Sequence, residues 1–162
     1  RRLGESSIEL PKSDVKNPVL EILVEGMGRI NFAQQLIDRK GITDRVTLNG
    51  MTLMNWEVCG LPMTDQYVQQ LKATNGAAER PGQFLKGTFR LSKAGDTYID
   101  VSGLKKGVIW VNGHNLGRYW EIGPQHRLYC PAPWLKKGTN EIVVFDLHQT
   151  TPASVSGAKT LE

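Results

Sequence analysis

The sequence predicts an all-β fold of the β-sandwich or jelly-roll type, and three observations support this prediction. Short segments alternate apolar and polar residues, Asn-Gly pairs separate two pairs of these segments, and helical periodicity is rare. Successive side chains of a strand point to opposite faces, so alternation gives each strand one apolar face. Many short strands of this kind, joined by Gly and Asn turns, are typical of a sandwich.

The predicted strands follow one another along the chain. Residues 19–25 alternate, and residues 46–48 and 51–53 flank Asn49-Gly50 as a hairpin would. An Asn-Gly pair suits a type I′ turn because both central residues take a positive φ. The same signature recurs at Asn112-Gly113, between residues 108–111 and 114–116. Residues 97–101 also alternate, and the more apolar residues 141–147 indicate a central strand.

Helical signals are short. Residues 32–38 could form one or two turns, and residues 133–138 a single turn closed by glycine. Thr64 or Asp65 could cap a short helix that ends near Leu71.

A stretch without periodicity divides the chain. Residues 75–82 are mostly small and polar, which indicates a linker or long loop. We therefore expect a partial jelly roll over 1–62, a linker over 63–82, a more complete jelly roll over 83–148 and a flexible tail over 149–162. Residues 1–62 hold few strands, so we expect them to need partner strands.

Composition excludes several classes of protein. The chain has 162 residues, 40% of them hydrophobic and 22% charged, which fits a globular protein with a real core. The net charge of +4 comes from interspersed residues of both signs, so we expect no nucleic-acid partner. No run of about 18 apolar residues occurs, so we expect no membrane span. The first residues show no apolar segment of a signal peptide.

Candidate reactive residues form no convincing catalytic centre. A glycosidase needs two carboxylates roughly 5–10 Å apart, and no pair among the 16 acidic residues stands out. The three histidines show no metal-ligand spacing, so we expect no catalytic residue, metal or cofactor. Cys59 and Cys130 could form one disulfide, but two buried free thiols are the favoured interpretation.

Aromatic residues are the more informative group. Trp110, Tyr119 and Trp120 lie within eleven residues, and Trp134 follows downstream. Such rings can stack on the C–H groups of sugars, or they can form the core and its rim. The sequence leaves both alternatives open.

Three strings carry a resemblance to a known family. They are residues 22–32 with 38–42, residues 56–58 with Leu61-Pro62, and residues 107–120 with 123–125 and 128–131. Together they resemble the C-terminal region of β-galactosidases of glycoside hydrolase family 35. The match covers about residues 1–148 in the right order.

The resemblance implies an organisation. Such enzymes have an N-terminal (β/α)₈ barrel with two catalytic glutamates, followed by two galactose-binding-like jelly rolls. Residues 1–62 would be the later strands of the first jelly roll, and residues 83–148 the second. No Glu of this chain matches the catalytic motifs, so the barrel of the same polypeptide is the implied partner. The resemblance also implies a periplasmic, lysosomal or secreted location, because members of this family are usually found there.

The resemblance also implies a substrate rim at Arg29, Asn31 and Phe32. In family members the matching loop reaches the mouth of the barrel, and its aromatic residue borders the galactose pocket. Relatives often have Tyr where this chain has Phe32, so an apolar wall is retained and a hydroxyl is lost. Arg29 is expected to brace the loop, against Glu25.

Three hypotheses follow for the function. The first is a non-catalytic C-terminal region of a retaining β-galactosidase, which scaffolds the barrel and completes its rim. The second is an autonomous carbohydrate-binding module, in which Trp110, Tyr119, Trp120 or Trp134 stacks on sugars. The third is a purely structural or dimerisation module. An aromatic row on an exposed face would favour binding, and buried rings would favour scaffolding.

Overall fold

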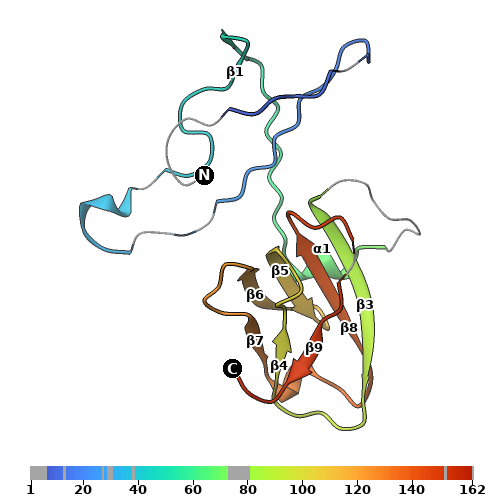
Figure 1. Ribbon diagram of the computed structural model, residues 1–162. Coiled ribbons are helices and arrows are strands. Elements are labelled where there is room, and N and C mark those ends of the chain that lie inside the picture. The colour runs from blue at the N-terminus through green and yellow to red at the C-terminus, as the bar shows by residue number, and fades with distance from the viewer. Residues whose placement is uncertain are drawn as a thin grey trace. The chain divides into compact units, whose positions relative to one another are not determined.

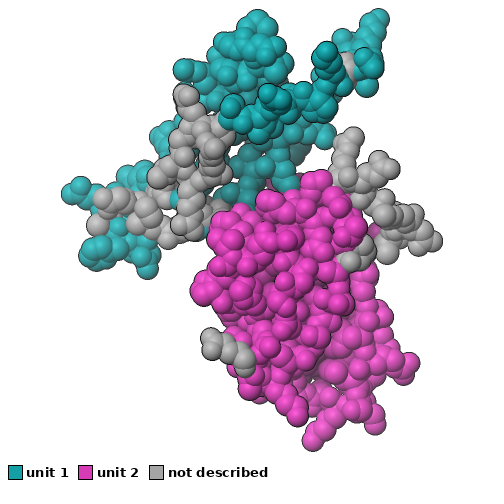
Figure 2. Space-filling model, in the orientation of Figure 1, with its two compact units in different colours: residues 1–59 teal, residues 60–162 magenta. Residues whose placement is uncertain are grey.

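The computed structural model describes residues 7–12, 14–26, 28, 31–37, 39–72, 81–151 and 153–161. The chain divides into two compact units, residues 1–59 and residues 60–162, which Figure 2 colours separately. Most of the regular structure lies in the second unit, and most of it is antiparallel β-sheet (Figure 1). The predicted all-β sandwich class is therefore confirmed.

The larger sheet of the second unit has four antiparallel strands in the order β3-β8-β5-β6. Their bounds are Gln83–Leu91 for β3, Gly138–Asp146 for β8, Lys106–Val111 for β5 and His114–Trp120 for β6. β8 pairs with β3 on one side and with β5 on the other. The central position expected for residues 141–147 is thus confirmed.

The smaller sheet has the order β7-β4-β9 and is also antiparallel. Its strands are Arg127–Cys130 for β7, Thr97–Asp100 for β4 and Ser156–Ala158 for β9. The 3-10 turn η2, Ala132–Trp134, follows β7 and leads toward β8. The two sheets are the layers of a sandwich.

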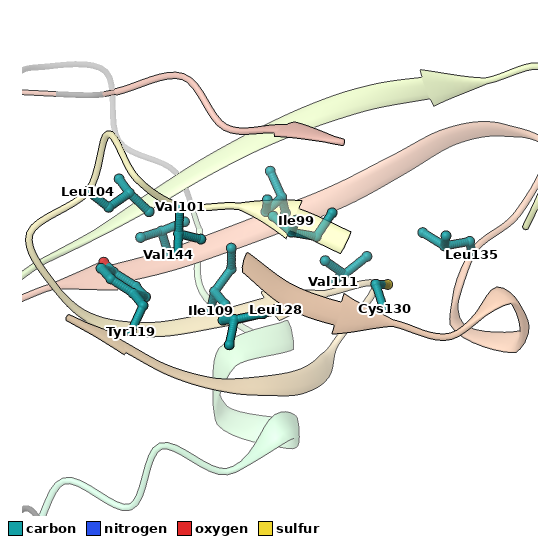
Figure 3. Close-up of a cluster of buried hydrophobic side chains, with 11 residues drawn as sticks. Ile99, Val101, Leu104, Ile109, Val111, Tyr119, Leu128, Cys130, Leu135 and Val144 are labelled. Carbon is teal, nitrogen blue, oxygen red and sulfur yellow. The ribbon is translucent and has the colours of Figure 1, made fainter. Parts of the chain in front are cut away.

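The core lies between these two layers. Figure 3 shows its side chains pointing into the space between the sheets. On β8 the even-numbered residues Ile142 and Val144 face this core, while Val143 and Phe145 face the opposite side. The buried members are Ile99, Val101, Leu104, Ile109, Val111, Tyr119, Leu128, Cys130, Leu135, Ile142 and Val144.

A second apolar cluster covers the outer face of the larger sheet. Trp110, Val143 and Phe145 are buried there together with Val68 of the helix α1, Asp65–Gln69. Thr64 caps this helix, because its Oγ1 accepts the backbone N–H of Tyr67 at 3.2 Å. Both faces of the larger sheet are therefore covered, which explains why β8 is apolar at consecutive positions.

Both predicted hairpins are confirmed. In the second unit Asn112 and Gly113 have φ values of 48° and 82°, as a type I′ turn requires. In the first unit Asn49 and Gly50 have φ values of 48° and 84° and join β1, Thr47–Leu48, to β2, Met51–Thr52. An Asn-Gly turn depends on two neighbouring residues only, so the sequence shows it directly.

The first unit contains little else that is regular among its described residues. The 3-10 turn η1, Ala33–Leu36, lies within the segment expected to form one or two turns. Residues 19–25 carry no strand, which corrects the expectation, and Val19, Ile22 and Val24 are exposed. A strand is stabilised by hydrogen bonds to neighbouring strands, and no strand of the described residues forms a ladder with this segment.

Two segments differ from the expected linker and flexible tail. Residues 63–72 include α1 and contribute Met63, Val68 and Leu71 to the outer cluster, while residues 73–80 lie outside the described residues. In the expected tail over 149–162, β9 pairs with β4. Short polar segments gain order here from tertiary hydrogen bonds, which local composition does not reveal.

The two cysteines are free thiols in different environments. Cys130 is buried in the core, and burial raises its pKa to about 11. Cys59 is exposed, which corrects the expectation that both would be buried. No helix in the described part of the chain is long and apolar enough to span a membrane.

Gly107 in β5 provides a test of this packing. A Cβ at this position would overlap the carbonyl oxygen of Phe145 on the neighbouring strand and approach the Tyr119 hydroxyl to 2.8 Å. We expect Gly107→Ala to lower the free energy of unfolding of the second unit by about 3 kcal/mol or more. Urea unfolding followed by tryptophan fluorescence measures this change.

Gly87→Ala in β3 is the matched control. A Cβ there would lie 3.5 Å from Ile142 Cγ2, an ordinary contact, so we expect a change within about 1 kcal/mol. Equal stability losses in the two variants would contradict the packing described here.

Candidate functional site

The predicted substrate rim lies in the first unit. Phe32 precedes η1 in an extended conformation and is 80% exposed, and Asn31 beside it is also exposed. Arg29 lies outside the described residues, so its expected bracing role stays a prediction. The described part of this loop thus presents an apolar ring that the first unit does not bury.

Trp110 lies at the centre of the outer cluster of the second unit. It is completely buried, and the ring centroid of Phe84 is 6.3 Å from its own. Its Nε1 is enclosed without a hydrogen-bond partner among the described residues. No ring face of Trp110 is open to solvent, which agrees with the packing alternative of the two that the sequence left open.

Tyr119 is buried on the opposite face of the same sheet, with 3% of its surface exposed. Its hydroxyl donates to Asp146 Oδ2 at 2.9 Å and lies 3.2 Å from the Phe145 carbonyl oxygen. Burial, together with the Asp146 carboxylate, raises the pKa of Tyr119 far above its usual value. Tyr119 is therefore a neutral donor within the core, and a stacking role is excluded for it as well.

Asp146 is the acceptor at the centre of this arrangement. Burial favours its neutral form, but three backbone N–H groups and the Tyr119 hydroxyl outweigh burial and hold the pKa of Asp146 below its usual value. The N–H groups of His148 and Gln149 donate to Oδ1 at 2.8 and 2.9 Å, and that of Lys105 to Oδ2 at 3.0 Å. These bonds assign Asp146 an architectural role.

Trp120, at the end of β6, is half-buried. Lys106 Nζ lies 4.2 Å from the centroid of its ring, which is a cation–π contact. One face of Trp120 is thus covered by a side chain of the neighbouring strand.

Trp134, in η2, packs partly against the core. His114 stacks on it, with ring centroids 4.8 Å apart and an interplanar angle of 13°. The backbone carbonyl of Trp134 accepts a hydrogen bond from the Asn112 side-chain amide at 2.7 Å. Trp134 therefore helps to fix the β5–β6 turn to the segment before β8.

The two half-buried tryptophans cannot form one continuous stacking surface. Trp120 pairs with Lys106 at the open end of the β5–β6 hairpin, while His114 pairs with Val111 next to its turn. Six residues of strand separate these two positions, which is about 20 Å at 3.3 Å per residue. The structure therefore does not unite the four candidate aromatics into a row.

Two polar residues of β8 were missed by the sequence reasoning. Asn140 and Asp146 are completely buried, and both fall on the same face of the strand as Ile142 and Val144. Asn140 Oδ1 accepts the Asn112 side chain at 2.8 Å and the Lys136 N–H at 2.9 Å. The sequence did contain a signal for them: Asn140 and Asp146 continue the alternate positions of Ile142 and Val144, which were expected to be buried. A buried polar side chain at such a position must be satisfied by hydrogen bonds.

Several other carboxylates of the second unit also serve its structure. Asp100 accepts hydrogen bonds from Ser102, which lower its pKa most, and from Arg127. Together they hold the pKa of Asp100 at about 2. Glu121 pairs with Lys105 at 2.7 Å and Glu141 with Lys86 at 2.8 Å. Among the described residues, no group of three His, Cys, Asp or Glu side chains could hold a metal ion.

Two protein-family models match the chain, one in each half. The model of the β-galactosidase first all-beta domain matches residues 2–62, and the model of the β-galactosidase galactose-binding domain matches residues 83–140. The class defined by fold and sequence is therefore a pair of consecutive β-domains, the second of them a sandwich of the galactose-binding type.

Curated relatives agree with this class. β-Galactosidase-1-like protein 2 of Homo sapiens is 40% identical over 141 residues, which are 83% of this chain and 22% of that protein. β-Galactosidase 17 of Arabidopsis thaliana is 36% identical over 166 residues, or 90% of this chain and 24% of that protein. A β-galactosidase of Xanthomonas manihotis is 38% identical over 130 residues, or 80% of this chain and 21% of that protein.

The chain belongs to the β-galactosidases of glycoside hydrolase family 35, and it corresponds to their C-terminal β-domains. It spans between 20% and 28% of the length of the curated relatives compared. In those relatives, the matching region is part of a much longer polypeptide.

Replacement of Trp110 tests its packing role. We expect Trp110→Ala to lower the free energy of unfolding by about 3–5 kcal/mol, because it empties the centre of the outer cluster. Trp120→Ala is the control, with an expected loss of about 1 kcal/mol from a half-buried ring and one cation–π contact. Denaturant unfolding compares the two. An unchanged melting temperature in Trp110→Ala, together with loss of sugar binding, would restore the binding interpretation.

Proposed function

We propose that this chain is the non-catalytic C-terminal β-sandwich region of a β-galactosidase that removes terminal β-galactosyl residues with retention of configuration. In this proposal it scaffolds the catalytic (β/α)₈ barrel of the same polypeptide and contributes Arg29, Asn31 and Phe32 to the rim of the active site. The barrel supplies the acid/base and nucleophilic carboxylates of the double displacement.

The observation that carries the proposal is the order of the two family matches. The match to the β-galactosidase first all-beta domain comes first in the chain, and the match to the β-galactosidase galactose-binding domain follows it. The structural use of the second unit's carboxylates adds support. Asp100, Asp146, Glu121 and Glu141 are held by hydrogen bonds or ion pairs that maintain the fold.

Exposed apolar residues of the first unit support a scaffolding contact. Val19, Phe32, Met54 and Val58 each expose more than three quarters of their surface. Large apolar side chains exposed to this extent are consistent with a surface that contacts other protein segments. In the full-length polypeptide, the remaining strands of the first β-domain and the barrel would cover Val19, Met54 and Val58, whereas Phe32 would remain at the rim of the active site.

The positions of the aromatic rings favour scaffolding over an autonomous carbohydrate-binding module. Trp110 and Tyr119 are buried, and Trp120 and Trp134 each have a ring face covered by Lys106 or His114. A stacking module would need several open ring faces on one surface, and these four rings do not share one.

The first test is activity of the 162-residue chain by itself. We expect no turnover of a chromogenic β-galactoside, even at high protein concentration, because no carboxylate pair in this chain matches the catalytic motifs. The full-length polypeptide serves as the positive control, and a mock preparation sets the background. Turnover that co-purifies with the chain above that background would contradict the proposal.

The second test concerns Phe32 in the full-length enzyme. If its ring walls the galactose pocket, Phe32→Ala should cost about 1–2 kcal/mol of transition-state binding, seen as a roughly 5- to 30-fold fall in kcat/KM. The melting temperature should stay nearly unchanged, because the ring is 80% exposed within the first unit.

Leu36→Ala is the matched control, since Leu36 ends η1 and is 62% exposed. We expect its kinetics to equal those of the parent enzyme. Phe32→Tyr keeps the ring and adds the hydroxyl of the relatives, so it should retain activity. A large stability loss in Phe32→Ala with unchanged kinetics would show that Phe32 packs in a core.

A further inference from the structure

β3 forms one edge of the larger sheet in the second unit. It is nine residues long and pairs with β8 along its whole length (Figure 1). In the part of the chain that the structure describes, no hydrogen bond joins residues 84–91 to a strand other than β8. About half of the backbone groups of an edge strand point away from its sheet, and such an edge can accept a further strand.

An apolar groove accompanies this edge. β9 is an edge strand of the smaller sheet, and β3 and β9 both line a pocket with a volume of about 540 Å³, here called the seam groove. Ile99, Leu135 and Ile142, which belong to the core of the sandwich, also line it. The sandwich is therefore open between its two sheets along β3.

Two glycines leave the seam groove open. On β3 the core-facing neighbours Leu85 and Phe89 pack on the core, whereas Gly87 on the same face is exposed. On β9 Gly157 lies opposite Ile99, a core residue, and is exposed as well. Each edge strand therefore has a glycine at a core-facing position where a side chain would fill the groove.

Neither glycine is required by the packing of the second unit. Neither has a positive φ, and an added Cβ would meet its nearest atom at 3.5 Å, which is an ordinary contact. At Gly107, by contrast, a Cβ would overlap the carbonyl oxygen of Phe145. Glycine weakens a strand interior and often marks the close approach of another backbone. The two glycines thus indicate a chain that approaches from outside.

The unpaired edge and the seam groove together select an extended polypeptide. The backbone groups of an added strand would pair with those of β3, and its alternate side chains would point toward Ile99 and Ile142. A small apolar molecule could cover these residues but could not pair with a row of backbone groups. Lys93 and Asp96 give the lining one charge of each sign, so neutral, apolar side chains fit it best.

We propose that a β-strand from another part of the full-length polypeptide adds to β3 and places apolar side chains in the seam groove. This inference rests on the proposed function, because it takes the strand from the longer polypeptide. The matching region makes up between 20% and 28% of the curated relatives compared, so most of the polypeptide is available to supply the strand. A segment of the same polypeptide binds at a high effective concentration, so one short strand suffices.

Hydrogen exchange of the β3 amides tests the proposal. In the 162-residue chain, the amides of residues 84–91 that point away from β8 should exchange rapidly. In the full-length polypeptide, the same amides should exchange at least about a hundredfold more slowly, because they donate to the added strand. Mass spectrometry with residue resolution compares the two proteins. The β3 amides that bond to β8 should be protected in both and serve as the internal reference.

Equal exchange of β3 in the two proteins would overturn the proposal. Protection in the 162-residue chain that increases with its concentration would also overturn it, because a second copy would then cover the edge. Galactosidase turnover by the full-length polypeptide with β3 unprotected would remove this inference alone. Protection of β3 without turnover would support this inference and remove the proposed function.

Gly87→Val links the protection to the seam groove. In the full-length polypeptide, the new side chain occupies the space of the added strand, so the protection of β3 should fall at least about tenfold. In the 162-residue chain, the same change puts a β-branched residue into an open groove, so the melting temperature should stay the same or rise. Arg90→Val is the matched control, because this exposed position of β3 does not line the groove and protection should be unchanged.

Gly157→Val repeats the test from β9 and keeps the proposal falsifiable if Gly87→Val fails to fold. It should also reduce the protection of β3 in the full-length polypeptide at least about tenfold, because Gly157 lines the same groove. Undiminished protection in a folded glycine variant would separate the added strand from the seam groove and would overturn the proposal.

Discussion

The buried carboxylate of Asp146 is the interaction on which the second unit depends. It joins the end of β8 to the residue before β5, to Tyr119 of β6 and to the two residues that lead away toward β9. A buried charge is costly unless donors surround it, and here four donors do so. The same corner requires Gly107, because the Phe145 carbonyl and the Tyr119 hydroxyl leave no space for a side chain.

Burial on both faces is the second constraint on the larger sheet. One face packs on the smaller sheet, and the other face packs on α1 and its flanking residues. Residues 63–72 therefore belong to the fold of the second unit, although they were expected to be part of a linker. Gln69 of α1 also contacts the Asn112-Gly113 turn, where a Cβ on Gly113 would overlap it. The helix thus covers the sheet and contacts the tip of its hairpin.

The family signature of this chain lies mostly in residues that maintain the fold. The string from Gly107 to Trp120, which carries the family resemblance most strongly, is used mainly for structure: a glycine with no room for a side chain, a buried tryptophan, a type I′ turn and a buried tyrosine. Under the proposed function, recognition falls instead to the exposed Phe32 of the first unit, which the described fold does not bury.

Local sequence was sufficient to predict the features that depend on neighbouring residues. These are the two Asn-Gly hairpins, the Thr64 cap, the central apolar strand and the family, because turns, caps and motifs are local in the chain. The folded chain was needed to show that Trp110 and Tyr119 lie on opposite buried faces, that Asp146 is a structural acceptor, and that residues 156–158 form a strand. It was also needed to show that residues 19–25 carry no strand, despite their alternation. These outcomes depend on partners distant in sequence, and alternation alone cannot identify such partners.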